Sequence, residues 1–259
     1  MNTLDETAFG ADPGRWPLPT AQTAEEHWLR AVAAGGQGRY ATAMAELETL
    51  ARLSAAGPFP ALALSTRASF LRQLGWHSHA RTWDGRALAL AGAHADARAD
   101  ALIGLAADAL GVGRFPLSAR LLARAGDGVD AAASARLPVR LAWVSAELAM
   151  ATGDGAAAVG HAERAVALAA ALDSVRHAVK SDVVLAAALC CVGEVERSRG
   201  VADTALEVTE RYDLVPLTWA LACLLADVGS EARGRPQVVA LRNDCAAAVQ
   251  DQGGVWSNR

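Results

Sequence analysis

Residues that build β-sheets are scarce in this sequence of 259 residues. It contains one isoleucine, two tyrosines and four phenylalanines, and aromatic residues make up only 5% of the chain. An extensive sheet is therefore not expected, because β-branched and aromatic side chains are the ones that favour strands. Alanine is abundant by contrast, with 62 residues, and it is the strongest helix former. The composition predicts an all-α protein.

An excess of positive charge is also missing. The chain has 24 lysines and arginines against 28 aspartates and glutamates, a net charge of −4, and these charges are scattered along the sequence. Proteins that bind nucleic acids usually carry a basic excess or a basic stripe. We therefore expect no nucleic-acid partner.

Long apolar runs and paired cysteines are lacking too. The longest apolar stretch, residues 214–228, contains Pro216 and Asp227 and is too short to span a bilayer. The first residues show neither the basic start nor the apolar core of a signal peptide. The four cysteines have no C-x-x-C spacing, and we interpret them as reduced thiols. These features predict a cytoplasmic protein without a membrane partner.

Signatures of catalysis are absent from the sequence. It has no G-x-S-x-G elbow, no Walker loop and no H-E-x-x-H motif. His77 and His79 form the best candidate for a metal site, but no cysteine or carboxylate stands at ligand spacing near them. We expect no metal, no cofactor and no enzymatic activity.

The sequence does contain an internal repeat. Glycines that end helical stretches recur every 36 to 40 residues, at Gly38, Gly75, Gly113, Gly153, Gly193 and Gly229. An alanine stands seven residues before each of them: Ala31, Ala68, Ala106, Ala146, Ala186 and Ala222. Small residues at fixed points let two antiparallel helices approach closely, and such hairpins must stack to bury their apolar stripes. The repeat therefore predicts stacked helical hairpins.

This pattern resembles the tetratricopeptide repeat family. In that family a small residue lies midway along the first helix, and the turn is followed by an aromatic and a small residue. Two turns match: Gly38-Arg-Tyr40 with Ala43, and Gly113-Arg-Phe115 with Ser118. The repeats are longer than the usual 34 residues, as in some bacterial relatives. The resemblance implies an α-solenoid of about six antiparallel helix-turn-helix repeats, or about twelve helices.

The repeats define one domain, residues 22–251. Residues 1–21 are rich in glycine and proline and show no helical period, so we expect a flexible N-terminal arm. Residues 252–259 are expected to form a C-terminal tail, in which Trp256 is unusually apolar.

The concave groove of such a solenoid is the expected binding site, because the family uses it for extended or helical peptides. Three tryptophans stand ten residues before a repeat glycine, and tryptophan is enriched in binding hot spots. Arg140 and Lys180 both stand thirteen residues before their glycines and would suit an acidic peptide with an apolar anchor. The predicted groove residues are Trp28, Arg72, Arg140, Trp143, Glu147, Lys180 and Trp219.

Two interpretations of this strip stay open. In one, the tryptophans only pack between adjacent repeats and the charges are solvated. In the other, they bind a partner, and the protein is an interaction scaffold or regulator that takes a peptide or helix of another protein. A domain that senses a small ligand is the alternative function. A closed pocket would favour that alternative, whereas an open, continuous groove would favour a peptide.

Overall fold

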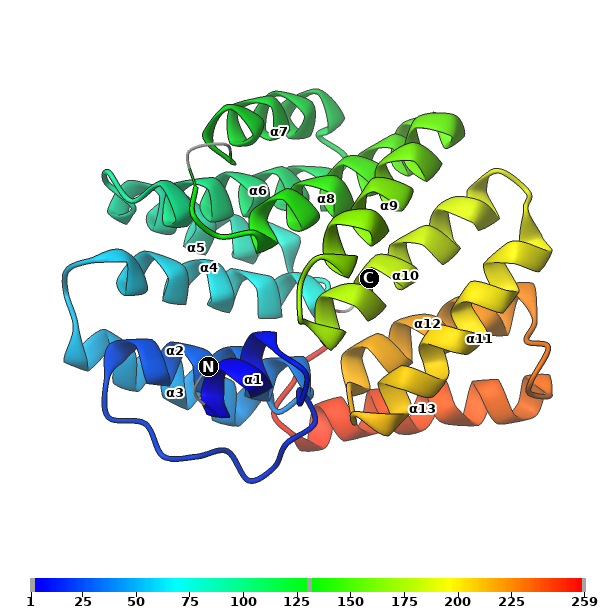
Figure 1. Cartoon of the computed structure of the whole chain (residues 1–259), viewed down its shortest axis with the longest axis horizontal. Coiled ribbons are helices and arrows are strands. Elements are labelled where there is room, and N and C mark those ends of the chain that lie inside the picture. The colour runs from blue at the N-terminus through cyan, green and yellow to red at the C-terminus, as the bar shows by residue number, and fades with distance from the viewer. Residues whose placement is uncertain (1–2, 130–131, 258–259) are drawn as a thin grey trace.

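The structure, a computed structural model, describes residues 3–129 and 132–257, and these form thirteen helices and no strand (Figure 1). A short helix, α1 (Thr3–Phe9), comes first. The other twelve form six hairpins: α2 (Ala24–Gly36) with α3 (Tyr40–Leu53), α4 (Pro58–Gln73) with α5 (His77–Leu90), α6 (Ala95–Gly111) with α7 (Phe115–Val129), α8 (Arg136–Thr152) with α9 (Gly155–Ala170), α10 (Val175–Cys191) with α11 (Val195–Arg211), and α12 (Val215–Val228) with α13 (Arg235–Asp251). The predicted all-α fold of six helical hairpins is confirmed.

The repeat glycines lie in the turns of the six hairpins. Each has a positive φ, from 75° at Gly113 to 89° at Gly229. An L-residue with a side chain rarely adopts this conformation, which explains why glycine recurs at these positions. None of the described helices is long and apolar enough to cross a membrane.

The six aligned alanines lie in the first helices of the six hairpins. All six side chains are fully buried. In the third hairpin the Ser118 hydroxyl donates a hydrogen bond to the Ala106 carbonyl oxygen at 2.9 Å, and in the fifth Ser198 donates to Ala186 at 2.7 Å. A side chain longer than a methyl group would hold the two helices apart, so the alanines set the spacing of each hairpin.

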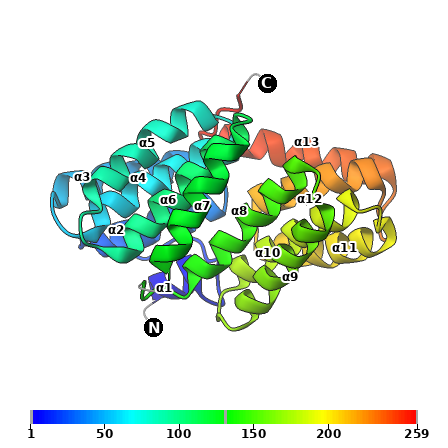
Figure 2. The same ribbon diagram turned by 90° about the horizontal axis from the view of Figure 1, so that it is seen from above.

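The hairpins follow one another around a ring, and the first and last are neighbours (Figure 1). The Ala41 amide of α3 donates a hydrogen bond to the Gln252 carbonyl oxygen, directly after α13, at 2.8 Å. The Arg39 guanidinium lies 4.0 Å from the carboxylate of Asp213, which precedes α12. Figure 2 shows the molecule from above, with α13 extending from the side of α11 and α12 toward α5.

The residues after α13 join the last hairpin to the second. The Trp76 indole N–H donates to the Val255 carbonyl oxygen at 2.7 Å, and the Ser257 amide donates to the Leu74 carbonyl oxygen at 2.8 Å. The indole ring of Trp256 lies 4.5 Å from that of Trp219, between ring centroids. The tail is therefore an ordered strap across one end of the ring.

The expectation of a flexible arm is wrong for residues 3–9, which form helix α1. Leu4, Thr7 and Ala8 are buried, and the Val175 amide at the start of α10 donates to the Gly10 carbonyl oxygen at 3.2 Å. A helix of two turns is too short to show a period in the sequence. Its stability comes from packing, mainly against α2 and to a smaller extent against α10.

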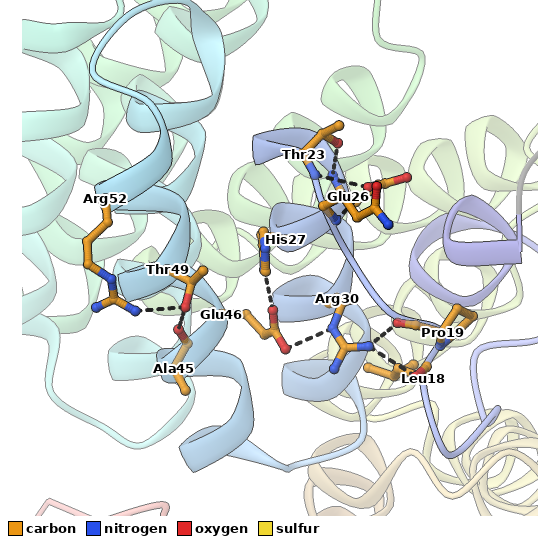
Figure 3. A network of polar contacts seen from close by, with 11 residues as sticks. Leu18, Pro19, Thr23, Glu26, His27, Arg30, Ala45, Glu46, Thr49 and Arg52 are labelled. Atoms are coloured by element: carbon orange, nitrogen blue, oxygen red, sulfur yellow. Dashed lines mark hydrogen bonds and ion pairs between the residues drawn. The ribbon is translucent and has the colours of Figure 1, made fainter.

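The residues between α1 and α2 are held by side chains of the first hairpin (Figure 3). Arg30 donates to the carbonyl oxygens of Leu18, at 3.0 Å, and Pro19, and its Nε lies 2.8 Å from Glu46 Oε1. A capping box of Thr23 with Glu26 then begins α2. This segment is thus bound along the first hairpin.

Candidate functional site

The inner side of the ring contains a cavity of about 440 Å³. First helices of the hairpins form most of its wall, Phe9 of α1 adds to it, and Trp256 of the tail lies at its edge. All seven residues predicted for the groove line this cavity: Trp28, Arg72, Arg140, Trp143, Glu147, Lys180 and Trp219. Their role in binding a partner remains a prediction. Small-ligand sites usually have volumes of about 300–1,000 Å³, so the cavity has the size of such a site.

Two of the predicted tryptophans connect adjacent hairpins. The Trp28 indole N–H donates to Thr66 Oγ1 of α4, and that of Trp143 donates to Ser181 Oγ of α10, both at 2.9 Å. Trp143 also stacks on His177, with ring centroids 5.5 Å apart. The tryptophans therefore pack between repeats and at the same time present part of their rings to the cavity.

The predicted cations Arg140 and Lys180 each face a carboxylate of the preceding hairpin. Arg140 Nε lies 3.1 Å from Asp100 Oδ1, and Lys180 Nζ lies 3.3 Å from Glu147 Oε1. All four side chains are at least partly buried, so these pairs are screened less than pairs in open solvent. Arg140 and Lys180 are consequently partly neutralised.

Arg72 belongs to a buried ion cluster behind the cavity wall. Its Nη1 contacts the carboxylates of Asp84 and Asp108, at 3.0 Å for Asp108, and both carboxylates are fully buried. Gly104 of α6 makes room for this cluster, because a Cβ there would overlap the Asp84 carboxylate. Burial raises the pKa of Asp84 to about 7, and burial also raises the pKa of Asp108. The two carboxylates therefore fix the position of the Arg72 side chain.

The structure adds two arginines that the sequence reasoning missed. Arg136 and Arg176 lie in the first turns of α8 and α10. The guanidinium carbon of Arg136 is 3.9 Å from the ring centroid of Phe9. Arg176 donates to the carbonyl oxygens of Ala8 and Val32, both at 3.2 Å. Both arginines line the cavity where α1 crosses it.

The charges of these two arginines have no ion-pair partner among the described residues. Within residues 3–129 and 132–257, no carboxylate oxygen lies within 4.0 Å of either guanidinium group. Burial lowers the pKa of Arg136 to about 10, although Asp100 acts to raise it. Burial, followed by the charges of Arg136 and Arg140, lowers the pKa of Arg176 to about 10. Burial, followed by the same arginines, lowers the pKa of His177 well below its usual value. The imidazole is therefore neutral and the positive charge belongs to the arginines.

No family model matches this sequence, and no curated protein does. Among solved structures, a Rap protein complexed with Competence and Sporulation Factor superposes with a TM-score of 0.68 at 12% identity. The likeness covers 89% of this chain and 64% of the Rap chain, so this chain spans less than two thirds of that protein's length. The chain has a helical-repeat fold. At this identity the likeness shows the fold alone.

The helical-repeat register contains the signal for the two missed arginines. Arg136 and Arg176 both stand seventeen residues before their repeat glycines, one helical turn before Arg140 and Lys180. Extending the comparison of repeats by one turn would have found them. Phe9 has no counterpart in any repeat, so the register could not predict its place in the cavity.

Proposed function

We propose that this protein is a scaffold or regulator that binds a segment of a partner protein in the cavity of its ring. We also propose that its repeats are of the tetratricopeptide type and that it works in the bacterial cytoplasm. The main support is helix α1, a short segment from outside the repeats that already lies on the inner face. Its Phe9 ring lies 5.3 Å from Trp28 and 6.1 Å from His177, between ring centroids. This face therefore accepts a short helix with an aromatic anchor.

The cavity wall offers both parts of a peptide site. The rings of Trp143, Trp219 and Trp256 present flat apolar surface, which is typical of binding hot spots. The pair of Glu147 and Lys180 offers an acceptor and a donor for the backbone of a bound segment. The similar Rap protein is complexed with Competence and Sporulation Factor, which agrees with a helical-repeat fold serving as a binding scaffold.

A second candidate function is the sensing of a small effector. The volume of about 440 Å³ favours it, together with the position of α1 and of Trp256 at the edges of the cavity. A ligand of this kind would be enclosed on several sides, unlike a long peptide in an open groove.

One experiment distinguishes the two proposed functions. Protein captured from the native organism is compared between the unchanged chain, W143A and W219A, with W83A as the matched control. Trp83 of α5 lies against Arg67 and Arg86, outside the cavity wall. We expect the same partner with the unchanged chain and W83A, and its loss with both cavity variants.

Melting temperatures of the same variants provide the check on folding. Capture that persists in W143A and W219A while their melting temperature falls would make these tryptophans purely structural and would contradict the proposal. A low-mass compound retained by the unchanged protein in native mass spectrometry, without any captured protein, would favour the sensing function.

A further inference from the structure

Three arginines meet where α1 lies across the starts of α8 and α10. Arg140 has Asp100 as a partner, whereas Arg136 and Arg176 have no ion-pair partner among the described residues. Asp96 and Asp100 still raise the pKa of Arg136 through their electrostatic field, although neither forms an ion pair with it. Burying like charges together is unfavourable unless an anion compensates them. Such a cluster at a cavity wall is therefore typical of a site for an anionic ligand.

The end of α1 covers this cluster with neutral groups. The Ala8 carbonyl oxygen accepts from Arg176, and the Gly10 carbonyl oxygen accepts from the Val175 amide, both at 3.2 Å. The Phe9 ring lies under the guanidinium of Arg136 at 3.9 Å. The chain itself thus places an aromatic ring and adjacent acceptor oxygens on the arginines.

We propose that this cluster is the binding site for an aromatic carboxylate, and that α1 occupies the site when the ligand is absent. The ring of the ligand takes the place of Phe9 under Arg136. Its carboxylate takes the place of the carbonyl oxygens and binds Arg176. This inference rests on the proposed function, for which it names the chemistry that the site recognises.

The exchange gives Arg176 a better partner, because a carboxylate carries the opposite charge to a guanidinium group. A carboxylate brings an opposite charge that a neutral carbonyl lacks, and arginine can bind a carboxylate with two parallel bonds. The cation–π contact with Arg136 is retained, because the ligand supplies its own ring. The ligand therefore gains an ion pair that α1 cannot offer.

Helix α1 can leave without unfolding the rest of the N-terminal segment. It has seven residues, too few for a helix that is stable by itself in water. The bonds that hold the following residues lie beyond it, from Gln37 Nε2 to the Pro13 carbonyl oxygen at 2.8 Å and from Arg30 to Leu18. The segment after Pro13 thus stays in place as α1 moves.

The test uses 3-phenylpropionate and its neutral amide, 3-phenylpropanamide, as probes of calorimetric binding to the full chain. We expect the acid to bind at least tenfold more tightly than the amide. R176Q should weaken the acid at least tenfold, and F9A should strengthen it several-fold because the competing ring is gone. R124Q, an exposed arginine on α7, is the matched control and should bind like the unchanged chain.

A tetrapeptide, Ala-Ala-Ala-Phe, distinguishes the two sources of an aromatic carboxylate. Tighter binding of its free-acid form than of 3-phenylpropionate identifies the C-terminus of a partner chain, and exclusion of the peptide identifies a small aromatic acid.

Equal affinity for acid and amide, or unchanged affinity in R176Q, would overturn the proposal. Weaker binding in F9A and in a chain without residues 1–9 would overturn the part assigned to α1, because α1 would then be a wall of the site. If R176Q binds 3-phenylpropionate as tightly as the unchanged chain while W143A still loses the captured partner, the proposed function stands and this inference fails.

Discussion

Asp84 shares one guanidinium group with Asp108, so the buried cluster around Arg72 has one carboxylate in excess. Burial raises the pKa of Asp84 from 3.8 to about 7 in the folded protein. Between these two values the folded state holds a proton that the unfolded chain has released. The contribution of Asp84 to the free energy of unfolding therefore rises as the pH falls from about 7 to about 4. At about 1.4 kcal/mol per pKa unit, this gain is on the order of 4 kcal/mol.

D84N removes this titration while keeping the shape of the side chain. Urea unfolding of both proteins is measured from pH 4 to pH 8, and the difference in free energy of unfolding is followed, because the effects of groups outside this cluster then cancel. We expect the unchanged protein to gain stability over D84N as the pH falls, mostly between pH 7 and pH 4. D127N, an exposed position on α7, controls for the loss of one carboxylate.

Two outcomes would refute this reasoning. A difference that is independent of pH would mean that Asp84 does not titrate in this range. A difference with the opposite slope would mean that Arg72 holds the carboxylate ionised in the folded protein, so that its pKa lies below that of the unfolded chain.

Three further changes test the packing of the repeats by urea unfolding and melting temperature. G104A should lower the free energy of unfolding by about 1–3 kcal/mol, because its Cβ would overlap the Asp84 carboxylate. G160A, which has open space around it, should raise the free energy of unfolding by about 0.5–1 kcal/mol. Equal effects of the two substitutions would contradict the account of the cluster. A146L should cost about 1–3 kcal/mol by overpacking a fully buried position, and an unchanged melting temperature would show that the repeat register is wrong. Removal of residues 253–259 should cost about 2 kcal/mol, chiefly by the loss of the two hydrogen bonds to the second hairpin and of the packing of an indole ring. An unaffected melting temperature would show that the strap contributes nothing.

The repeat could be predicted from the sequence because its determinants are local and recur. A glycine with positive φ and an alanine seven residues before it mark every hairpin, so each repeat supports the interpretation of the others. The tryptophan positions follow from the same register, and Trp28, Trp143 and Trp219 all line the cavity.

Features without a counterpart in other repeats could not be predicted in this way. Helix α1 accepts a hydrogen bond from Arg176, which lies far along the chain, and its two turns carry no pattern of their own. The partners of Arg140 and Lys180 come from the preceding hairpins, and their pairing depends on how neighbouring first helices align. The closure of the ring depends on the sum of small rotations between hairpins, which composition and spacing do not specify.

The contact between the first and last hairpins changes how this array should unfold. In an open solenoid each repeat touches only its neighbours, and the terminal repeats fray independently of the middle. Here the bond from the Ala41 amide to the Gln252 carbonyl oxygen leaves neither terminal hairpin without a neighbour on its outer side. Opening that seam exposes both hairpins at once, so their amide hydrogens should exchange together as one cooperative unit. Because the seam joins residues far apart in sequence, it also raises the contact order, and its closure should be the slow step of folding.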